Sequence, residues 1–218
     1  MNHDFWHQRW QQNQIGFHSQ EINAHLQRFW PRLAVNPGSR VFVPLCGKSN
    51  DMLWLLAQGH QVAGVELSPM AVDAFFSENN LHPNIRQQNN FLIYEIDGLQ
   101  IFCGDFFALS SADLGQIDAV YDRAALVAMP PEMRIEYVSH LSKLLEPGLK
   151  ILLVSFDYPQ LEMPGPPFSV PNEEIEMLFH NWCSIDLLTT EDALEHELRF
   201  KQRGLTSMNE QVYQLVVY

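Results

Sequence analysis

One short run, VFVPLCGKSNDM from Val41 to Met52, constrains the fold of this chain most. It reads as a buried strand that breaks into a tight turn and then starts a helix, and the next strand ends on an acid, Glu66. This order of strand, glycine turn, helix, strand and acid is typical of a nucleotide-type cofactor site at the first crossover of an α/β sheet. The turn and the helix N-terminus offer backbone N–H groups, and the acid accepts hydrogen bonds from a ribose.

The remaining sequence continues the alternation of strands and helices. Strands are expected over 40–45, 61–66, 116–122 and 149–156, and helices over 19–33, 49–58, 69–79, 130–145 and 172–181. Apolar and polar residues alternate over 91–102 around Asp97-Gly98, which indicates an antiparallel hairpin. Strands near 184–188 and 211–218 end the chain. The pattern predicts a doubly wound sheet with a reversed C-terminal edge, which binds its ligand at the carboxyl ends of the strands.

The length and the distribution of proline predict the domain organisation. A chain of 218 residues, 46% of them hydrophobic, suits one domain with a substantial core. Residues 1–36, rich in Trp, Gln and His, are expected to form an N-terminal helical lid. Five prolines within 158–171 predict a stiff, irregular active-site loop.

Charge and cysteine content exclude several classes of partner. The net charge is −13, from 13 basic and 26 acidic residues, which argues against nucleic acids and anionic membranes but leaves small anionic ligands open. The three cysteines form no CxxC pair, and neither a signal peptide nor a membrane span is evident. We expect a cytoplasmic protein and, because no spare apolar helix face is apparent, a monomer.

The composition of the turn discriminates among cofactors. A dinucleotide site would show GxGxxG after the first strand, whereas PLCGKS contains one glycine. Lys48-Ser49 resembles a phosphate loop, but Phe42 occupies the position of its first glycine. A cofactor without phosphates, such as S-adenosylmethionine, fits better, since its ribose still needs Glu66. An NAD(P)-dependent oxidoreductase and a non-catalytic ligand-binding module remain the alternatives.

Two other chemistries are disfavoured. Cys46 lies in the turn, but no His and Asp partners lie near it in the sequence, so a buried thiol is the simpler interpretation. His3 and His7 have the spacing of a zinc motif with Asp4 between them, yet the glutamate of that motif is absent. The sequence therefore predicts no metal site.

Four segments together resemble the thiopurine S-methyltransferase family, in its bacterial form. They are RVFVPLCGKSNDMLWLLAQGHQVAGVELSPMAV at 40–72, FWHQRWQQNQIGFHSQ at 5–20, YDRAALVAMPPEMR at 121–134 and PGPPFSVPNEEIEMLF at 164–179. The resemblance extends over almost the whole chain. It implies a class I methyltransferase fold, Rossmann-like and seven-stranded with helices on both faces, that methylates the sulfur of thiopurines or related aromatic thiols. It also suggests selenium or tellurium acceptors and a role in detoxification.

The resemblance also implies roles for individual residues. At the cofactor it implies Trp6, Trp10, Phe17, Leu45, Glu66, Gly104, Asp105 and Arg123, and the turn itself adds Gly47. At the acceptor it implies Arg123 and Arg199, with Arg203 as a competitor for the last position. Phe17 is also expected there, and Phe168 in the proline-rich loop is expected to line the acceptor pocket and stack on a heterocycle. Arg123 and Arg199 would hold the acceptor as its anionic thiolate, through charge-assisted hydrogen bonds.

Structural roles are open for the same residues. Glu66 could cap the helix that begins near Ser68. The aromatic residues Trp6, Trp10 and Phe17 could pack the N-terminal segment onto the sheet. Arg123 could form a surface ion pair with Asp122 or Glu132.

Overall fold

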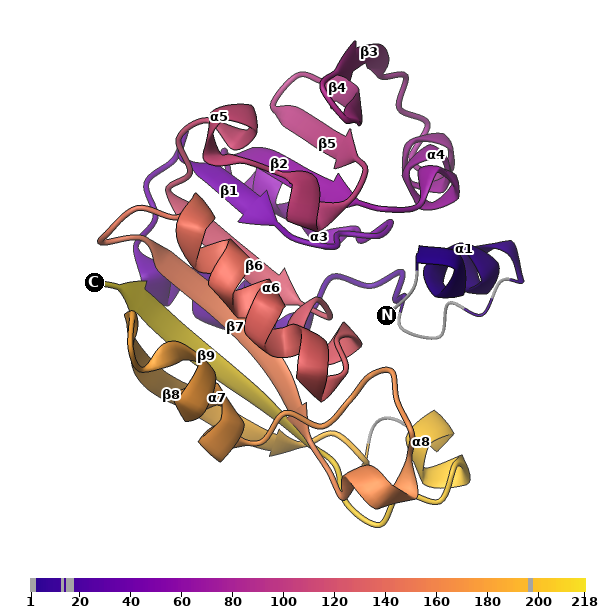
Figure 1. Cartoon of the computed structure of the whole chain (residues 1–218), viewed down its shortest axis with the longest axis vertical. Coiled ribbons are helices and arrows are strands. Elements are labelled where there is room, and N and C mark those ends of the chain that lie inside the picture. The colour runs from indigo at the N-terminus through magenta and orange to yellow at the C-terminus, as the bar shows by residue number, and fades with distance from the viewer. Residues whose placement is uncertain (1–2, 13, 15–17, 196–197) are drawn as a thin grey trace. The chain divides into compact units, whose positions relative to one another are not determined.

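The structure is a computed structural model of the chain, and it describes residues 3–12, 14, 18–195 and 198–218, without the side chains of residues 3, 198 and 199 (Figure 1). The chain forms two compact units, Met1–Tyr121 and Asp122–Tyr218. Strand β6 (Ala119–Arg123) contains residues of both units.

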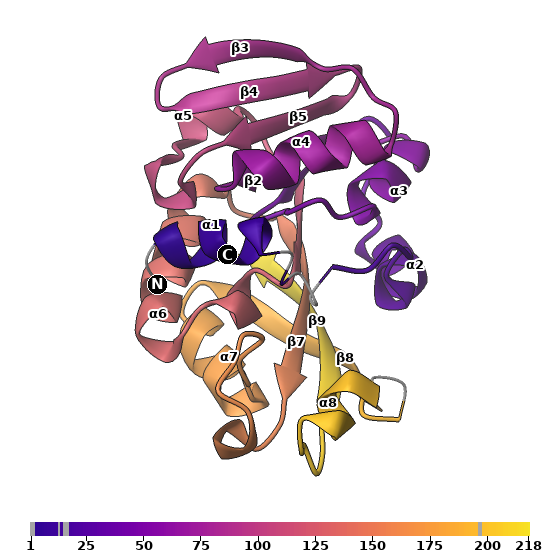
Figure 2. The same ribbon diagram turned by 90° about the vertical axis from the view of Figure 1, so that its right-hand side faces the viewer.

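The first unit is built on a sheet with the strand order β3-β4-β5-β2-β1-β6. Figure 2 labels the first four of these strands, β3, β4, β5 and β2. Strands β1 (Arg40–Val43), β2 (Gln61–Glu66), β5 (Leu99–Cys103) and β6 pair in parallel. Strands β3 (Asn84–Gln88) and β4 (Phe91–Ile96) add an antiparallel edge next to β5. The central strands are buried along nearly their whole length, as expected of parallel strands covered by helices.

Helices α3 (Asp51–Ala57) and α4 (Pro69–Glu78) pack against β2, and α1 (His3–Gln11) packs against α4. Ser68 caps α4 by accepting a hydrogen bond from the Ala71 N–H, and Pro69 occupies the first helical position. The first unit also contains α2 (Ala24–Phe29), η1 (Trp30–Leu33), η2 (Phe106–Ala108) and α5 (Ser111–Leu114).

The second unit contains β9 (Asn209–Val217) between β7 (Lys150–Asp157) and β8 (Cys183–Asp192), antiparallel to both. Helix α7 (Asn172–Phe179) packs against β8 and against α6 (Pro131–Leu144). The unit is completed by η3 (Leu126–Ala128), η4 (Gln160–Glu162) and α8 (Leu198–Gln202). No helix in the described part of the chain is both long and apolar enough to cross a membrane.

The predicted α/β class, with parallel central strands and an antiparallel C-terminal edge, is confirmed. The strand count differs, because the described residues form nine strands and not seven. Residues 91–102 contribute both strands of the predicted hairpin, and β3 precedes them as an unpredicted edge strand of mainly polar, exposed residues.

Two predicted helix starts differ from the structure by more than one residue. The helix expected over 19–33 begins at Ala24, because the Asn23 side chain caps it. It continues as the 3-10 helix Trp30–Leu33, which contains Pro31. The helix expected over 49–58 begins at Asp51, and the Ser49 hydroxyl accepts a hydrogen bond from the Asp51 N–H. The helix expected over 172–181 begins at Asn172, as predicted.

Candidate functional site

The turn after β1 adopts backbone conformations that few residues tolerate. Leu45 has φ +46° and Gly47 has φ +53°, both in the left-handed region. The turn is tied to the sheet by a hydrogen bond of 3.0 Å from the Cys46 N–H to the Val65 carbonyl. Leu45 carries a Cβ, so its backbone is strained in this conformation. Such strain is often found at ligand-binding positions.

Glu66 lies at the carboxyl end of β2 and connects this turn to α4. Its Oε2 accepts a hydrogen bond from the Gly47 N–H at 2.9 Å, and its Oε1 accepts one from the Ser68 N–H at 2.8 Å. The residue is only 7% exposed. The carboxylate therefore stabilises both the glycine turn, which the sequence pattern assigns to a cofactor, and the start of α4.

Burial changes the acidity of Glu66. Desolvation raises the pKa of its carboxyl from 4.5 to about 7, and the N–H donors of Ser68, Gly47 and Leu67 limit the rise. The group is therefore poised to change its charge near neutral pH.

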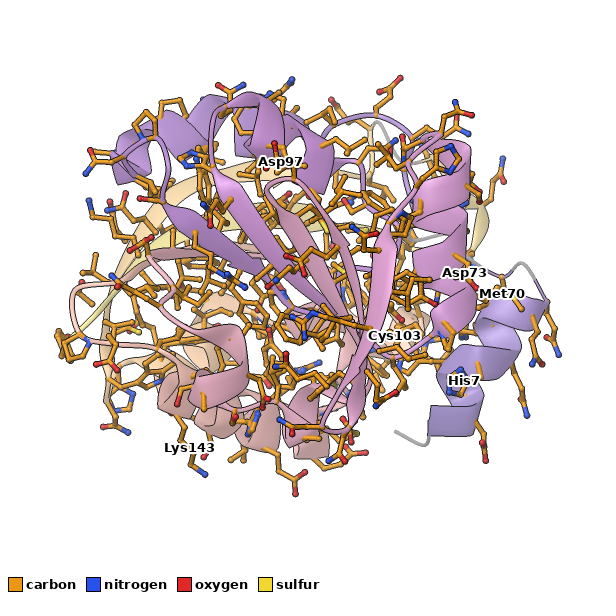
Figure 3. All side chains as sticks on the ribbon, turned by 90° about the horizontal axis from the view of Figure 1, so that it is seen from above. His7, Met70, Asp73, Asp97, Cys103 and Lys143 are labelled. Carbon is orange, nitrogen blue, oxygen red and sulfur yellow. The ribbon has the colours of Figure 1, made fainter. Side chains whose placement is uncertain are left out.

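Trp10 packs onto the glycine turn. A Cβ placed on Gly47 would lie 3.5 Å from Cζ2 of Trp10, and the Trp10 side chain is buried. Trp6 is half-buried and meets Phe5 edge to face. Phe17, the third predicted aromatic residue of this group, lies outside the described residues. Figure 3 shows His7 on α1 beside Met70 and Asp73 on α4.

Gly104 and Asp105 follow β5, the strand next to β2. The Gly104 N–H donates to the Glu66 carbonyl at 2.9 Å, so the two strand ends are adjacent. Any side chain at Gly104 would collide with Phe91, since a Cβ would lie 2.6 Å from its ring. The Asp105 carboxylate caps η2 by accepting from the Phe107 N–H at 3.0 Å.

Asp51, which was not predicted as a site residue, organises the neighbourhood of the turn. It is 1% exposed, and its two oxygens accept hydrogen bonds from the Asn23 N–H at 2.8 Å and the Tyr121 hydroxyl at 3.0 Å. Because these partners lie 28 and 70 residues away in the chain, the local sequence gives no signal for this role.

Two neighbouring side chains do not support rival chemistries. Burial, with Glu66 nearby, raises the pKa of the Cys46 thiol well above its usual range, so it is not an activated nucleophile. Lys48 forms an ion pair with Glu78 at 2.6 Å, so its ammonium is neutralised by a side chain of α4.

The first unit thus brings together Trp10, Leu45, Gly47, Glu66, Gly104 and Asp105 around the ends of β1, β2 and β5. The residues fit an adenosyl group. A carboxylate offers about four acceptor sites, so the three backbone donors leave room on Glu66 for a ribose hydroxyl.

In the second unit, Asp122 organises the loop that follows β6. Its oxygens accept hydrogen bonds from the Tyr137 hydroxyl at 2.6 Å and the Leu126 N–H at 3.2 Å. Burial raises the pKa of Asp122 to about 6. Arg123 is half-buried as the last residue of β6, and Ala124 after it has φ +68°.

The proline-rich loop is fixed by hydrogen bonds along its length. Examples are the Tyr158 hydroxyl to the Pro167 carbonyl at 2.6 Å and the Ser155 hydroxyl to the Val170 carbonyl at 2.9 Å. Phe168 is partly exposed, and its N–H donates to the Val127 carbonyl at 2.7 Å.

The two arginines near the C-terminus differ in how far they are described. Arg199 lies on α8, and its side chain is outside the described part of the structure. Arg203 is exposed, with Nη1 3.8 Å from the Met163 sulfur.

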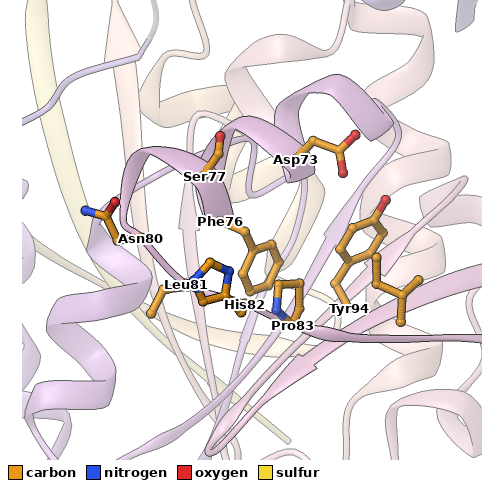
Figure 4. Close-up of a pocket in the computed structure, with 9 residues that line it drawn as sticks. Asp73, Phe76, Ser77, Asn80, Leu81, His82, Pro83 and Tyr94 are labelled. Carbon is orange, nitrogen blue, oxygen red and sulfur yellow. The ribbon is translucent and has the colours of Figure 1, made fainter.

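A cavity of about 350 Å³ lies where α4 meets β3 and β4 (Figure 4). Phe76 and Tyr94 stack along it with ring centroids 5.7 Å apart. Burial and the hydrogen-bonded Asp73 raise the pKa of Tyr94 to about 12. None of the described residues predicted to bind cofactor or acceptor lines this cavity. Within the described residues, no group of three or more His, Cys, Asp and Glu side chains could hold a metal ion.

Solved structures agree with the fold. A SAM-dependent methyltransferase from Anabaena variabilis superposes with a TM-score of 0.67 at 15% identity, covering 100% of this chain and 96% of that one. At this identity the similarity establishes the class of fold.

Sequence comparison establishes the family. The family described as thiopurine S-methyltransferase (TPMT) matches residues 1–217. Thiopurine S-methyltransferase of Nitrosospira multiformis is 51% identical over 99% of this chain and 98% of its own length. The protein of the same name from Pseudomonas fluorescens Pf0-1 is 48% identical over 99% of both chains. Family and fold together establish an enzyme that uses S-adenosylmethionine. The chain belongs to the thiopurine S-methyltransferase family.

Proposed function

We propose that this protein transfers the methyl group of S-adenosylmethionine to the sulfur of a thiopurine or a related aromatic thiol. The observation that supports this most is the buried Glu66 carboxylate, held by Gly47 and Ser68 at the end of β2. The alternatives are weaker: the turn lacks the glycines of a dinucleotide site, and the family is one of methyltransferases.

The first unit would hold the cofactor. Glu66 accepts hydrogen bonds from the ribose, and Trp10 offers an aromatic face near the turn, which suits a cationic sulfonium. Leu45 and Gly47 would present backbone atoms to it, and Gly104 and Asp105, which follow the strand next to β2, would lie beside the adenine. Trp6 and Phe17 would complete the lid expected over 1–36, and Arg123 would add a contact to the cofactor.

The acceptor would be bound by Phe168, Phe17 and the arginines. When bound, the cofactor supplies a methyl group on a sulfonium whose leaving group is a neutral thioether. The protein then contributes to catalysis by orienting the acceptor sulfur and by keeping it anionic. Arg123 and Arg199 do this through charge-assisted hydrogen bonds to the thiolate form, with Arg203 as the alternative to Arg199. Phe168 stacks on the flat heterocycle.

The same chemistry extends to other soft acceptors. Reduced selenium and tellurium species are soft nucleophiles like thiolates, so a detoxifying role against them is part of this proposal. We also propose that residues 1–218 act as one domain and that the enzyme is a cytoplasmic monomer.

A labelled-methyl assay tests the proposal. Purified protein with methyl-labelled S-adenosylmethionine should transfer label to 6-mercaptopurine, and a parallel reaction with selenite and a reductant tests the second class of acceptor. We expect Arg123→Ala to lower turnover at unchanged folding. Binding of S-adenosylhomocysteine without transfer to any acceptor would favour the binding module. A thermal shift with NADH but not with S-adenosylhomocysteine would favour the oxidoreductase.

A further inference from the structure

Arg134 is one of the largest fully buried side chains in the described structure, at 1% exposure on α6. Its Nε donates to the Met129 carbonyl at 2.9 Å. Its Nη1 lies 2.6 Å from both carboxylate oxygens of Glu174 on α7. One guanidinium therefore connects three segments: the end of the loop after β6, α6 itself and α7.

The remaining nitrogen of Arg134 has an unusual environment. Nη2 is buried and has no hydrogen-bond partner among the described residues. A buried donor without an acceptor is costly, so it calls for an explanation other than stability. The guanidinium carbon lies 5.9 Å from the centre of the Phe168 ring, over its face. The face of an aromatic ring attracts a cation at this distance.

The Phe168 ring is restrained from other directions as well. A Cβ on Gly165 would lie 2.5 Å from this ring, so the glycine backbone packs directly against it. The Phe168 N–H is bound to the Val127 carbonyl at 2.7 Å. Phe168 nevertheless stays partly exposed, so it can still meet a ligand.

We propose that Arg134 is a positioning residue: it fixes the plane of the Phe168 ring and so sets the preference of the enzyme for flat, aromatic acceptors. Arg134 does not touch the acceptor. This inference rests on the proposed function, in which Phe168 stacks on the acceptor ring.

The geometry requires arginine. Only a planar guanidinium can bond one carbonyl through Nε and a carboxylate through Nη1 while it lies against a ring. Lysine would keep the charge and lose the fixed arrangement. Glu174→Gln would remove the charged partner of Nη1 and leave the arginine in place.

The test compares two acceptors, 6-mercaptopurine and the non-aromatic thiol dithiothreitol, in Arg134→Lys, Glu174→Gln and wild-type protein. Arg134→Lys should raise KM for 6-mercaptopurine roughly three- to tenfold, with KM for dithiothreitol and the Kd for S-adenosylhomocysteine unchanged. In a Phe168→Leu background, Arg134→Lys should have no further effect on KM. Arg86→Lys is the matched control, since Arg86 pairs with Glu95 at the surface.

The outcomes separate the two proposals. A wild-type protein that binds S-adenosylhomocysteine but methylates neither 6-mercaptopurine nor any other aromatic thiol would overturn the proposed function, and this inference with it. If the wild type is active and the ratio of KM for 6-mercaptopurine to KM for dithiothreitol is the same in Arg134→Lys, the inference alone is overturned. An equal loss of activity with both acceptors would indicate that Arg134 has a purely structural role, and it would also overturn the inference. If Arg134→Lys does not fold, the same criteria apply to Glu174→Gln.

Discussion

At the scale of single residues, Glu66 is subject to two opposing effects. Burial disfavours its charge, whereas the N–H groups of Gly47 and Ser68 favour it, and the balance leaves the pKa at about 7. A ribose hydroxyl that donates to this carboxylate binds best to its ionised form. Cofactor affinity and the charge of Glu66 are therefore coupled.

We predict that S-adenosylhomocysteine binds about tenfold more tightly at pH 8 than at pH 6, because the ionised fraction of Glu66 rises about tenfold over that interval. Glu66→Gln should lose this dependence and weaken binding roughly 10- to 100-fold at pH 8. Calorimetric titration measures both. An affinity that is equal at the two pH values, or unaffected by the substitution, would contradict the role assigned to Glu66.

Gly104 has a steric role that can be tested separately. Gly104→Ala places a methyl group 2.6 Å from the Phe91 ring, so we expect a loss of roughly 1–3 kcal/mol in the free energy of unfolding. In the double variant with Phe91→Leu, the loss should be smaller than the sum of the two single losses. Urea denaturation of the four proteins measures the coupling, and strict additivity would exclude the collision.

Some site residues were predictable from sequence and others were not. Glu66 and Gly47 follow from a local pattern, since turn and acid occupy fixed places in a strand–helix–strand unit. Asp51 and Arg134 depend on partners far along the chain, such as Tyr121 and Glu174, and local sequence does not specify them.

At the scale of elements, the side chains of Asp51 and Asn50 connect the N-terminal segment to the start of α3. Asp51 accepts from the Asn23 N–H just before α2, and the Asn50 amide donates to the Gln20 carbonyl at 3.0 Å. These bonds explain why α2 starts at Ala24 and not at the predicted residue 19. The apolar pattern correctly predicted a helix in this segment. Its first residue was set by the Asn23 cap and not by the pattern.

We predict that Asp51→Asn costs about 1–3 kcal/mol in the free energy of unfolding, because an amide oxygen can accept from only one of the two donors in this geometry. Hydrogen exchange at the amides of Asn23 and Leu26 should become faster. Tyr121→Phe is the matched control, since it removes one donor and leaves the carboxylate bonded to Asn23. Unchanged exchange at both amides in Asp51→Asn would show that Asp51 does not hold this segment.

At the scale of the whole molecule, buried acids make stability depend on pH. The folded-state pKa values of Glu66 and Asp122 are about 7 and about 6, above their ordinary values of 4.5 and 3.8. Between the ordinary and the raised pKa, the folded protein binds a proton that the unfolded chain has released. The contribution of each carboxyl group to the free energy of unfolding therefore decreases as pH rises from the ordinary to the raised pKa. His60 acts in the opposite direction, since burial lowers its pKa below 6.5.

The variant Asp122→Asn separates the contribution of Asp122 to the pH dependence of stability from those of Glu66 and His60. In the ligand-free protein, Asp122→Asn should remove the part of the stability loss that falls between about pH 4 and pH 6, and leave the contributions of Glu66 and His60. Unfolding free energies of wild type and variant at pH 4 and pH 6 measure the difference in slope. Parallel slopes would mean that the pKa of Asp122 is not raised.

The sequence predicted the α/β class, because apolar parallel strands and their capped helices carry strong local signals. It missed β3, whose residues are mainly polar and exposed, because an edge strand is specified by pairing with β4 and not by its own pattern. The C-terminal strands are longer than predicted for the same reason: β8 continues to Asp192 through its pairing with β9.

The most direct test of the account is a crystal structure of the protein with S-adenosylhomocysteine bound. We predict that a ribose hydroxyl lies within hydrogen-bonding distance, roughly 2.6–3.2 Å, of a Glu66 carboxylate oxygen, with Trp10 against the turn at Gly47. A ligand bound elsewhere, with Glu66 bonded only to the backbone of the turn and of α4, would contradict the central claim.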